Sequence, residues 1–182
     1  MKTTVLQENL QKAVALSSHF VSQKSQLPIL SNILIQAKKS KLILSSTNLE
    51  TSVSTSIGAK VETDGEITVN GKILNDVVSN LSSGNLEIEV IKEQIKISSA
   101  NFKSKILGSN SSDFPKIPSH IDKNPFILKT NEFISSLSKV LSSVSTDETR
   151  PILTGVLFVS RGSTLYLVAT DGFRLSEIKI KN

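Results

Sequence analysis

Two stretches of nine residues, LPILSNILI at Leu27–Ile35 and RPILTGVLF at Arg150–Phe158, decide how the chain is organised. Each contains Pro-Ile-Leu followed by an aliphatic run, and their starting positions differ by 123 residues. The same ungapped shift lays LILSSTN at Leu42–Asn48 on LYLVATD at Leu165–Asp171. Two separated matches at one offset are hard to obtain by chance. They predict a duplicated domain of about 123 residues.

The residues around the first stretch predict one strand, one helix and three further strands. In the helical segment, Leu10, Ala13 and Val14 recur at the spacing that lines one face of a helix. The shift of 123 residues lays Leu10 on Phe133 and Val14 on Leu137. The expected strands are Lys2–Leu6, Ser31–Ala37, Lys41–Ser46 and Thr51–Ala59, and the expected helix is Gln7–Phe20.

The same order of elements recurs twice along the chain. The second copy is expected to contain strand Gly65–Val69, helix Lys72–Leu81, and strands Leu86–Val90, Gln94–Ser98 and Phe102–Leu107. The third is expected to contain strand Phe126–Lys129, helix Asn131–Val144, and strands Gly155–Ser160, Thr164–Ala169 and Ser176–Ile180. Asn131 is expected to cap the third helix. Its buried stripe should consist of Phe133, Leu137, Val140, Leu141 and Val144. The glycines are interpreted as scattered turn residues.

A linker separates the second copy from the third. The segment SNSSDFPKIPSHIDKNP at 109–125 combines Pro115, Pro118 and Pro125 with serine, asparagine and aspartate, a composition that interrupts helices and strands. We therefore expect a complete domain of two modules at residues 1–120 and the first half of a second domain at residues 121–182. Modules in which one helix is followed by three successive strands predict an α+β fold.

Composition places the protein among globular domains. Hydrophobic residues make up 38% of the chain and charged residues 20%, which is enough apolar surface for a packed core. There is no cysteine, and neither a signal peptide nor a run of apolar residues long enough to span a membrane is evident. A cytoplasmic protein with no membrane partner is expected. The net charge of +5 permits a polyanionic partner without requiring one.

The sequence carries no set of reacting groups. His19 and His120 are the only histidines and lie in different elements, so surface positions are expected for both. Asp147 and Glu148 are adjacent, which is typical of a solvated turn. No phosphate-binding loop, metal-ligand spacing or nucleophile elbow is present. We expect no enzyme, metal or cofactor. A nuclease or nucleotidyl transferase is the least favoured alternative, because a metal-binding carboxylate cluster is missing.

Longer strings resemble the bacterial sliding clamp, the beta subunit of DNA polymerase III. TDETRPILTGVLF at Thr146–Phe158 and ATDGFRLSEIKI at Ala169–Ile180 are similar to its second domain. LSSTNLETSVS at Leu44–Ser54 and SDFPKIP at Ser112–Pro118 are similar to its first. The resemblance implies a DNA-clamp fold of repeated strand–helix–three-strand modules, with antiparallel sheets outside and helices lining the inner face. It also implies a non-catalytic processivity factor that forms a homodimeric ring around duplex DNA.

Two groups of residues follow as candidate sites. Lysines on helices provide long, hydrated charges that contact phosphates without fixing a register. The candidate DNA contacts are Lys12, Lys72 and Lys139 on or beside the three helices, with Lys24 and Arg150 on the loops that follow. The resemblance further implies an apolar pocket for short peptides of the replicative polymerase, the clamp loader and repair proteins. Its matching residues are Arg150, Leu153, Thr170, Gly172, Phe173, Arg174 and Leu175. At position 173 the family commonly has histidine where this chain has phenylalanine.

The chain ends at Asn182, halfway through the second domain of the resembling family. One ring-closing surface is therefore expected to be missing. The remaining first-domain edge is expected near Lys72–Leu81 and Phe102–Leu107. The alternative function is a peptide-binding module of clamp fold that cannot close a ring because of truncation.

Overall fold

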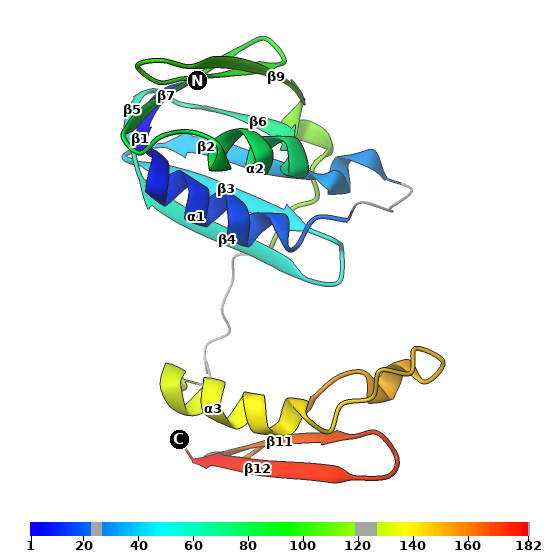
Figure 1. Ribbon diagram of the computed structural model, residues 1–182. Coiled ribbons are helices and arrows are strands. Elements are labelled where there is room, and N and C mark those ends of the chain that lie inside the picture. Colours follow the sequence, from blue (N-terminus) through cyan, green and yellow to red (C-terminus); the bar gives the residue numbers. More distant parts are fainter. Residues whose placement is uncertain (23–26, 119–126, 182) are drawn as a thin grey trace. The chain divides into compact units, whose positions relative to one another are not determined.

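The computed structural model describes residues 1–22, 27–118 and 127–181 of the chain. It divides into two units, Met1–Ser119 and His120–Asn182, which are described separately (Figure 1). All paired strands in both units are antiparallel, and helices pack against the sheets. The expected α+β class is therefore confirmed.

Unit 1 consists of two copies of one module. The first contains β1 (Lys2–Leu6), α1 (Gln7–Ser18), β2 (Asn32–Lys38), β3 (Lys41–Thr47) and β4 (Ser52–Gly58). The second contains β6 (Gly65–Asn70), α2 (Gly71–Ser79), β7 (Asn85–Ile91), β8 (Gln94–Ser98) and β9 (Lys103–Ser109). Between them lies β5 (Lys60–Thr63), which was not predicted as a separate strand. Single turns of 3₁₀ helix, η1 (Pro28–Ser31) and η2 (Ser111–Asp113), complete the unit.

The two modules exchange their first strands. The strand order is β4-β3-β2-β6-β9-β8-β7-β1-β5, so β1 of the first module pairs with β7 of the second, and β6 pairs with β2. Only Thr68 and Val69 of β6 pair with β9, through Ser109 and Gly108. Unit 1 is therefore two half-sheets that meet along one short joint.

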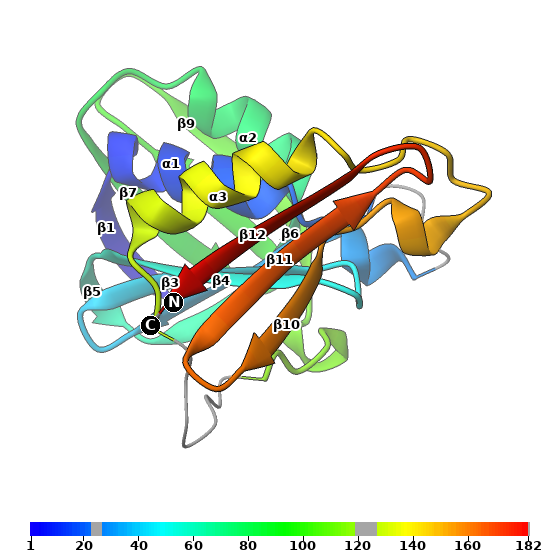
Figure 2. The same ribbon diagram turned by 90° about the horizontal axis from the view of Figure 1, so that it is seen from below.

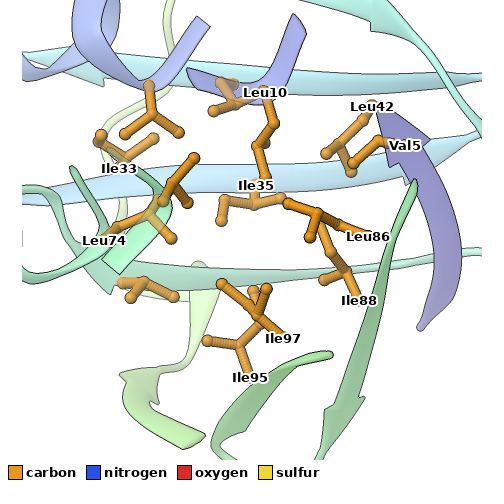
Figure 3. Close-up of a cluster of buried hydrophobic side chains, with 14 of the residues drawn as sticks. Val5, Leu10, Ile33, Ile35, Leu42, Leu74, Leu86, Ile88, Ile95 and Ile97 are labelled. Atoms are coloured by element: carbon orange, nitrogen blue, oxygen red, sulfur yellow. The ribbon is translucent and has the colours of Figure 1, made fainter. Parts of the chain in front are cut away.

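The core of unit 1 lies between the sheet and helices α1 and α2, which pack against each other. Leu10 of α1 and Leu74 of α2 point into it, and Ile35 and Ile97 reach it from the two half-sheets (Figure 3). Two side-chain hydrogen bonds fix the start of α2 and join α1 to α2. Asn70 caps α2 by accepting a hydrogen bond from the backbone N–H of Ile73 at 3.2 Å. The side-chain amide of Gln7 donates to the carbonyl of Val78 at 3.0 Å. Both modules therefore contribute to one continuous core.

One buried hydroxyl in this core has no partner. Within the described residues, Ser17 Oγ of α1 is buried without a hydrogen bond. We expect Ser17→Ala to raise the free energy of unfolding of unit 1 by about 1 kcal/mol, because alanine removes an unsatisfied polar group and favours a helix more than serine does. Urea unfolding followed by far-ultraviolet circular dichroism measures the change. The control is Ser18→Ala, whose hydroxyl donates to the carbonyl of Val14 at 2.8 Å. A Ser17→Ala protein less stable than the parent would contradict the reasoning.

Unit 2 contains one module. It consists of α3 (Thr130–Leu141), the 3₁₀ turn η3 (Pro151–Leu153), β10 (Leu157–Arg161), β11 (Thr164–Thr170) and β12 (Leu175–Lys181). Figure 1 shows α3 on one face of β11 and β12. Val140 of this helix belongs to a small buried cluster with Leu167 and Ile180. The opposite face of this three-stranded sheet carries no helix among the described residues.

Several expectations for unit 2 are wrong. Ile127–Lys129 do not form the expected strand, and Phe126 lies outside the described residues. The equivalent strand of unit 1 is β1, which pairs with β7 of the second module. Residues 127–181 contain a single module, so they offer no such partner strand. Asn131 lies inside α3, because the helix begins at Thr130 after Lys129. That helix ends at Leu141, which is half exposed.

Candidate functional site

An apolar cavity of about 350 Å³ opens in unit 2 where η3 meets the ends of β10 and β11. Leu153 of η3 and Thr170 of β11 line it together. The other lining residues are Ile152, Gly155, Val156, Leu157, Val168 and Ala169. Ile152 is 88% exposed and Leu157 60% exposed, so neither side chain is needed to hold the core. The cavity therefore offers apolar surface that a partner can cover.

The loop beside the cavity is held by Asp171. Its Oδ1 accepts the backbone N–H groups of Phe173 and Arg174 at 2.9 Å each, and its Oδ2 accepts Arg174 Nε at 2.9 Å. Thr170 Oγ1 donates to the carbonyl of Arg174 at 2.7 Å. Gly172 has φ +93°, a left-handed conformation that side chains disfavour. The sequence Thr-Asp-Gly-Phe-Arg is therefore a closed turn in which every polar side chain has a partner.

This turn should respond to acid. The hydrogen bond from the backbone N–H of Arg174, followed by that from Phe173, holds the pKa of Asp171 below its usual range. Folding thus favours the ionised carboxylate. Its stabilisation of the loop is present above the unfolded-state pKa of about 3.9 and is lost as pH falls through the lower folded-state pKa.

We expect the carboxyl carbon of Asp171, followed by nuclear magnetic resonance, to titrate at a pH below that of a model peptide. The amide shifts of Phe173 and Arg174 should change with the same midpoint, because both N–H groups bond to this carboxylate. In Asp171→Asn, which keeps an acceptor oxygen without the charge, this transition should vanish. An unshifted midpoint would contradict the observed hydrogen bonds.

Arg150 lies at the start of η3 and faces the same turn. Its Nε is 3.2 Å from Oδ2 of Asp147. The pKa of Asp147 lies below its usual range, chiefly because the Thr149 hydroxyl donates to the carboxylate, with a further contribution from Arg150. A methyl group placed on Gly172 would lie 3.6 Å from Arg150 Nη1. Arg150 and Gly172 are therefore neighbours, as a shared site requires.

The structure brings together only part of the pocket expected from the sequence. Leu153 and Thr170 line the cavity, and Leu175 is the cross-strand neighbour of Thr170 on the same sheet face. Leu175 is largely exposed, so it is not an ordinary core residue. Phe173, at 96% exposed, and Arg174 lie on the adjacent turn and do not line the cavity. Sequence reasoning missed the wall residues Ile152, Val156, Leu157 and Val168, although Ile152 stands directly beside Leu153.

Each helix exposes one of the expected lysines. Lys12 lies on α1, Lys72 on α2 and Lys139 on α3, all exposed, while Lys24 lies outside the described residues. Each helix also carries one acidic residue, in order Glu8, Asp76 and Glu132. The helices are therefore balanced in charge, and the excess of positive charge lies on other elements.

Nothing in the described residues suggests a catalytic or metal centre. His19 is exposed, and His120 lies outside the described part of the chain. The carboxylate of Asp147 is engaged in its own turn, by Thr149 and Arg150. Among residues 1–22, 27–118 and 127–181, no group of three or more metal-ligating side chains gathers in one place. In the same residues, no helix is long and apolar enough to cross a membrane.

Both units match known protein families. Residues 1–118 match the DNA polymerase III beta subunit, N-terminal domain, and residues 127–182 match the central domain of the same subunit. The beta sliding clamp of Synechocystis sp. is 32% identical over 98% of this chain and 48% of its own length.

Solved structures agree in fold. A sliding clamp from Bartonella birtlesii, bound to griselimycin, is 29% identical with a TM-score of 0.91, covering 100% of this chain and 50% of that one. A Helicobacter pylori beta clamp bound to a DNA ligase peptide is 24% identical, with a TM-score of 0.88, over 100% of this chain and 52% of that one. The chain thus spans about half the length of the relatives it matches.

Proposed function

The chain belongs to the DNA polymerase III beta-subunit family of sliding clamps, and from this premise we propose that it supplies the DNA-facing helices and one peptide-binding wall of such a clamp. The family is one of non-catalytic processivity factors. In the proposed function the clamp encircles duplex DNA and tethers the replicative polymerase through a short peptide. Any nucleotidyl-transferase activity belongs to the polymerase complex. We place the protein in the bacterial cytoplasm, where that complex works.

The observation that carries the proposal is the open apolar cavity beside η3. It joins Leu153 and Thr170, two residues expected from the sequence, to exposed aliphatic side chains. A cavity of about 350 Å³ accommodates one or two apolar side chains of an extended peptide. The neighbouring turn keeps Arg174 at the rim, where a guanidinium can bind a peptide carbonyl or carboxylate. The polymerase, the clamp loader and repair proteins are the proposed peptide donors.

Duplex DNA is the second proposed partner. Helices α1 and α2 pack side by side on one face of the unit 1 sheet and expose Lys12 and Lys72. Their acidic neighbours limit the attraction, so contact with phosphates should be weak, salt-sensitive and independent of base sequence. Such contact suits a protein held on DNA by enclosure. Lys24, Lys139 and Arg150 are proposed to contribute in the same way.

A ring also needs edges that join subunits. Within the described part of the chain, residues Lys103–Leu107 of β9 pair with β8 on one side only, because the pairing to β6 begins at Gly108. Phe102 and Leu107 are exposed beside this unpaired edge. Backbone groups without partners and exposed apolar side chains are what a strand-to-strand junction buries. We propose this edge, together with α2, as the subunit contact of the homodimeric ring.

Two measurements test the function. Calorimetry with a Gln-Leu-x-Leu-Phe peptide should detect binding by the 182-residue chain. A version extended to the length of its relatives should, after loading, remain on circular DNA and leave linearised DNA through the ends. Peptide binding without retention on circular DNA would favour the alternative, a peptide-binding module. Absence of both would reject the assignment.

A further inference from the structure

The helix-free face of the unit 2 sheet carries a cluster of cations. Strand pairing places Arg161 of β10 and Lys181 of β12 on either side of Thr164 in β11. One register step along, Lys179 stands opposite Tyr166, two residues from Thr164 on the same face. The carbon Cζ of Arg161 lies 5.6 Å from the centroid of the Tyr166 ring, and Nζ of Lys179 lies 5.3 Å from it. The ring thus holds two cations close together through cation–π contact.

Most of this charge has no counter-ion in the part of the chain that the structure describes. Lys179 Nζ is 3.4 Å from Glu177 Oε1, an exposed pair that contributes little. Among the described residues, neither Arg161 nor Lys181 forms an ion pair. The arginines at the cavity rim differ, because Arg150 and Arg174 are each paired with an aspartate three residues earlier. The unpaired cations of this sheet therefore lie away from the rim, on the open face.

The cation cluster and the apolar cavity share that face. Along β11, Thr164, Tyr166, Val168 and Thr170 point to the same side, and the last two line the cavity. Leu157 of β10 stands opposite Val168 and also lines the cavity. From Val168 to Thr164 a strand covers roughly 13 Å, at about 3.3 Å per residue. An extended peptide anchored in the cavity reaches the cations after about four residues.

We propose that this face binds an acidic segment flanking the apolar anchor of the peptide that fills the cavity. The net positive charge of the face favours an acidic partner, because its three cations, Arg161, Lys179 and Lys181, outnumber the single carboxylate of Glu177. The apolar cavity on the same face favours a peptide over nucleic acid, because a peptide can fill it with aliphatic side chains while its flanking carboxylates meet the cations. The inference rests on the proposed function, because the anchor must bind first.

The test compares five peptides on the 182-residue chain by fluorescence anisotropy. One is the Gln-Leu-x-Leu-Phe anchor alone. The other four carry a tail of three glutamates or three glutamines, placed four residues before or four residues after the anchor. We expect the glutamate tail at one end to bind about tenfold more tightly than the glutamine tail at low salt. This advantage should disappear near 0.5 M salt, where charges are screened beyond about 4 Å.

The double variant Arg161→Gln/Lys179→Gln should remove the advantage of the glutamate tail and leave the affinity for the anchor unchanged. Lys96→Gln is the matched control, because Lys96 also lies on a strand and is 3.5 Å from a carboxylate, that of Glu89. Equal affinities for the two tails would overturn the inference while leaving the proposed function intact. If no peptide binds, both fail together. Loss of duplex DNA binding in the double variant, without any preference for glutamate, would instead assign the face to nucleic acid and overturn the inference.

Discussion

Replacing Gly108 with alanine is expected to lower the free energy of unfolding of unit 1 by about 2–3 kcal/mol, the cost of overpacking a closed site. A Cβ at this position would lie 2.6 Å from Ile67 Cδ1 and 2.6 Å from the backbone oxygen of Thr68. Ile67 is buried, and the Thr68 oxygen belongs to β6 itself. The Thr68 oxygen cannot move without displacing β6, and the Ile67 side chain is enclosed by the core.

The position is sensitive because the joint it occupies is short. Gly108 and Ser109 are the only residues of β9 that pair with β6, so displacing this pair separates the two half-sheets. The backbone N–H of Gly108 also donates to the carbonyl of Glu93 at 2.8 Å. The interpretation of the glycines as turn residues is therefore wrong for Gly108, which lies inside a strand and allows close approach of another backbone.

Unit 2 serves as an internal control for this experiment. Tyr166 is the single tyrosine of the chain and lies in unit 2, and the chain has no tryptophan, so tyrosine emission follows the unfolding of unit 2 alone. In urea, Gly108→Ala should shift the circular dichroism transition of unit 1 and leave the tyrosine emission transition in place. Gly58→Ala is the matched substitution, because a Cβ there meets nothing within 4 Å. Equal stability of the two variants would show that the joint tolerates the extra atom.

Local sequence patterns predicted most of the helices and strands, because such a pattern depends only on which side chains of one segment are buried. In β2, Ile33, Ile35 and Ala37 alternate with half-buried neighbours, so their spacing alone predicts a strand with one face in the core. β5 lacks such a pattern, since only Val61 of its four residues is even partly buried. The requirement for glycine at 108 arises from pairing with Thr68 and Val69, about forty residues earlier, which no local pattern contains.

The site was predicted less completely, for a related reason. The turn at Asp171 and Gly172 follows from local chemistry, and the structure places it beside Arg150. The sequence alone, however, does not distinguish an aliphatic side chain that is buried in a core from one that is exposed and available to a binding partner. Leu175 and Ile152 are exposed while Leu167 is fully buried, and only the packing of the sheet separates them. The position of Tyr166 between two cations likewise depends on strand register.

Replacing Ile152 with aspartate should weaken binding of the Gln-Leu-x-Leu-Phe peptide by about 30-fold or more, the loss typical of an interface hot spot. Ile152 lines the cavity and is 88% exposed, so its side chain is available to a ligand. An aspartate there would lose apolar contact, and its charge would have to be desolvated when the peptide binds. Calorimetry at constant salt measures the dissociation constant.

Stability should not change with this substitution, because a side chain so exposed contributes little to the core. The tyrosine emission transition of unit 2 checks this directly, since Tyr166 lies two residues along β11 from Val168 in the cavity wall. Ile134→Asp is the matched control. Ile134 is also exposed in unit 2, but it lies on α3, which packs on the other face of the sheet. Unchanged peptide affinity in Ile152→Asp, or an equal loss in Ile134→Asp, would place the peptide somewhere other than this cavity.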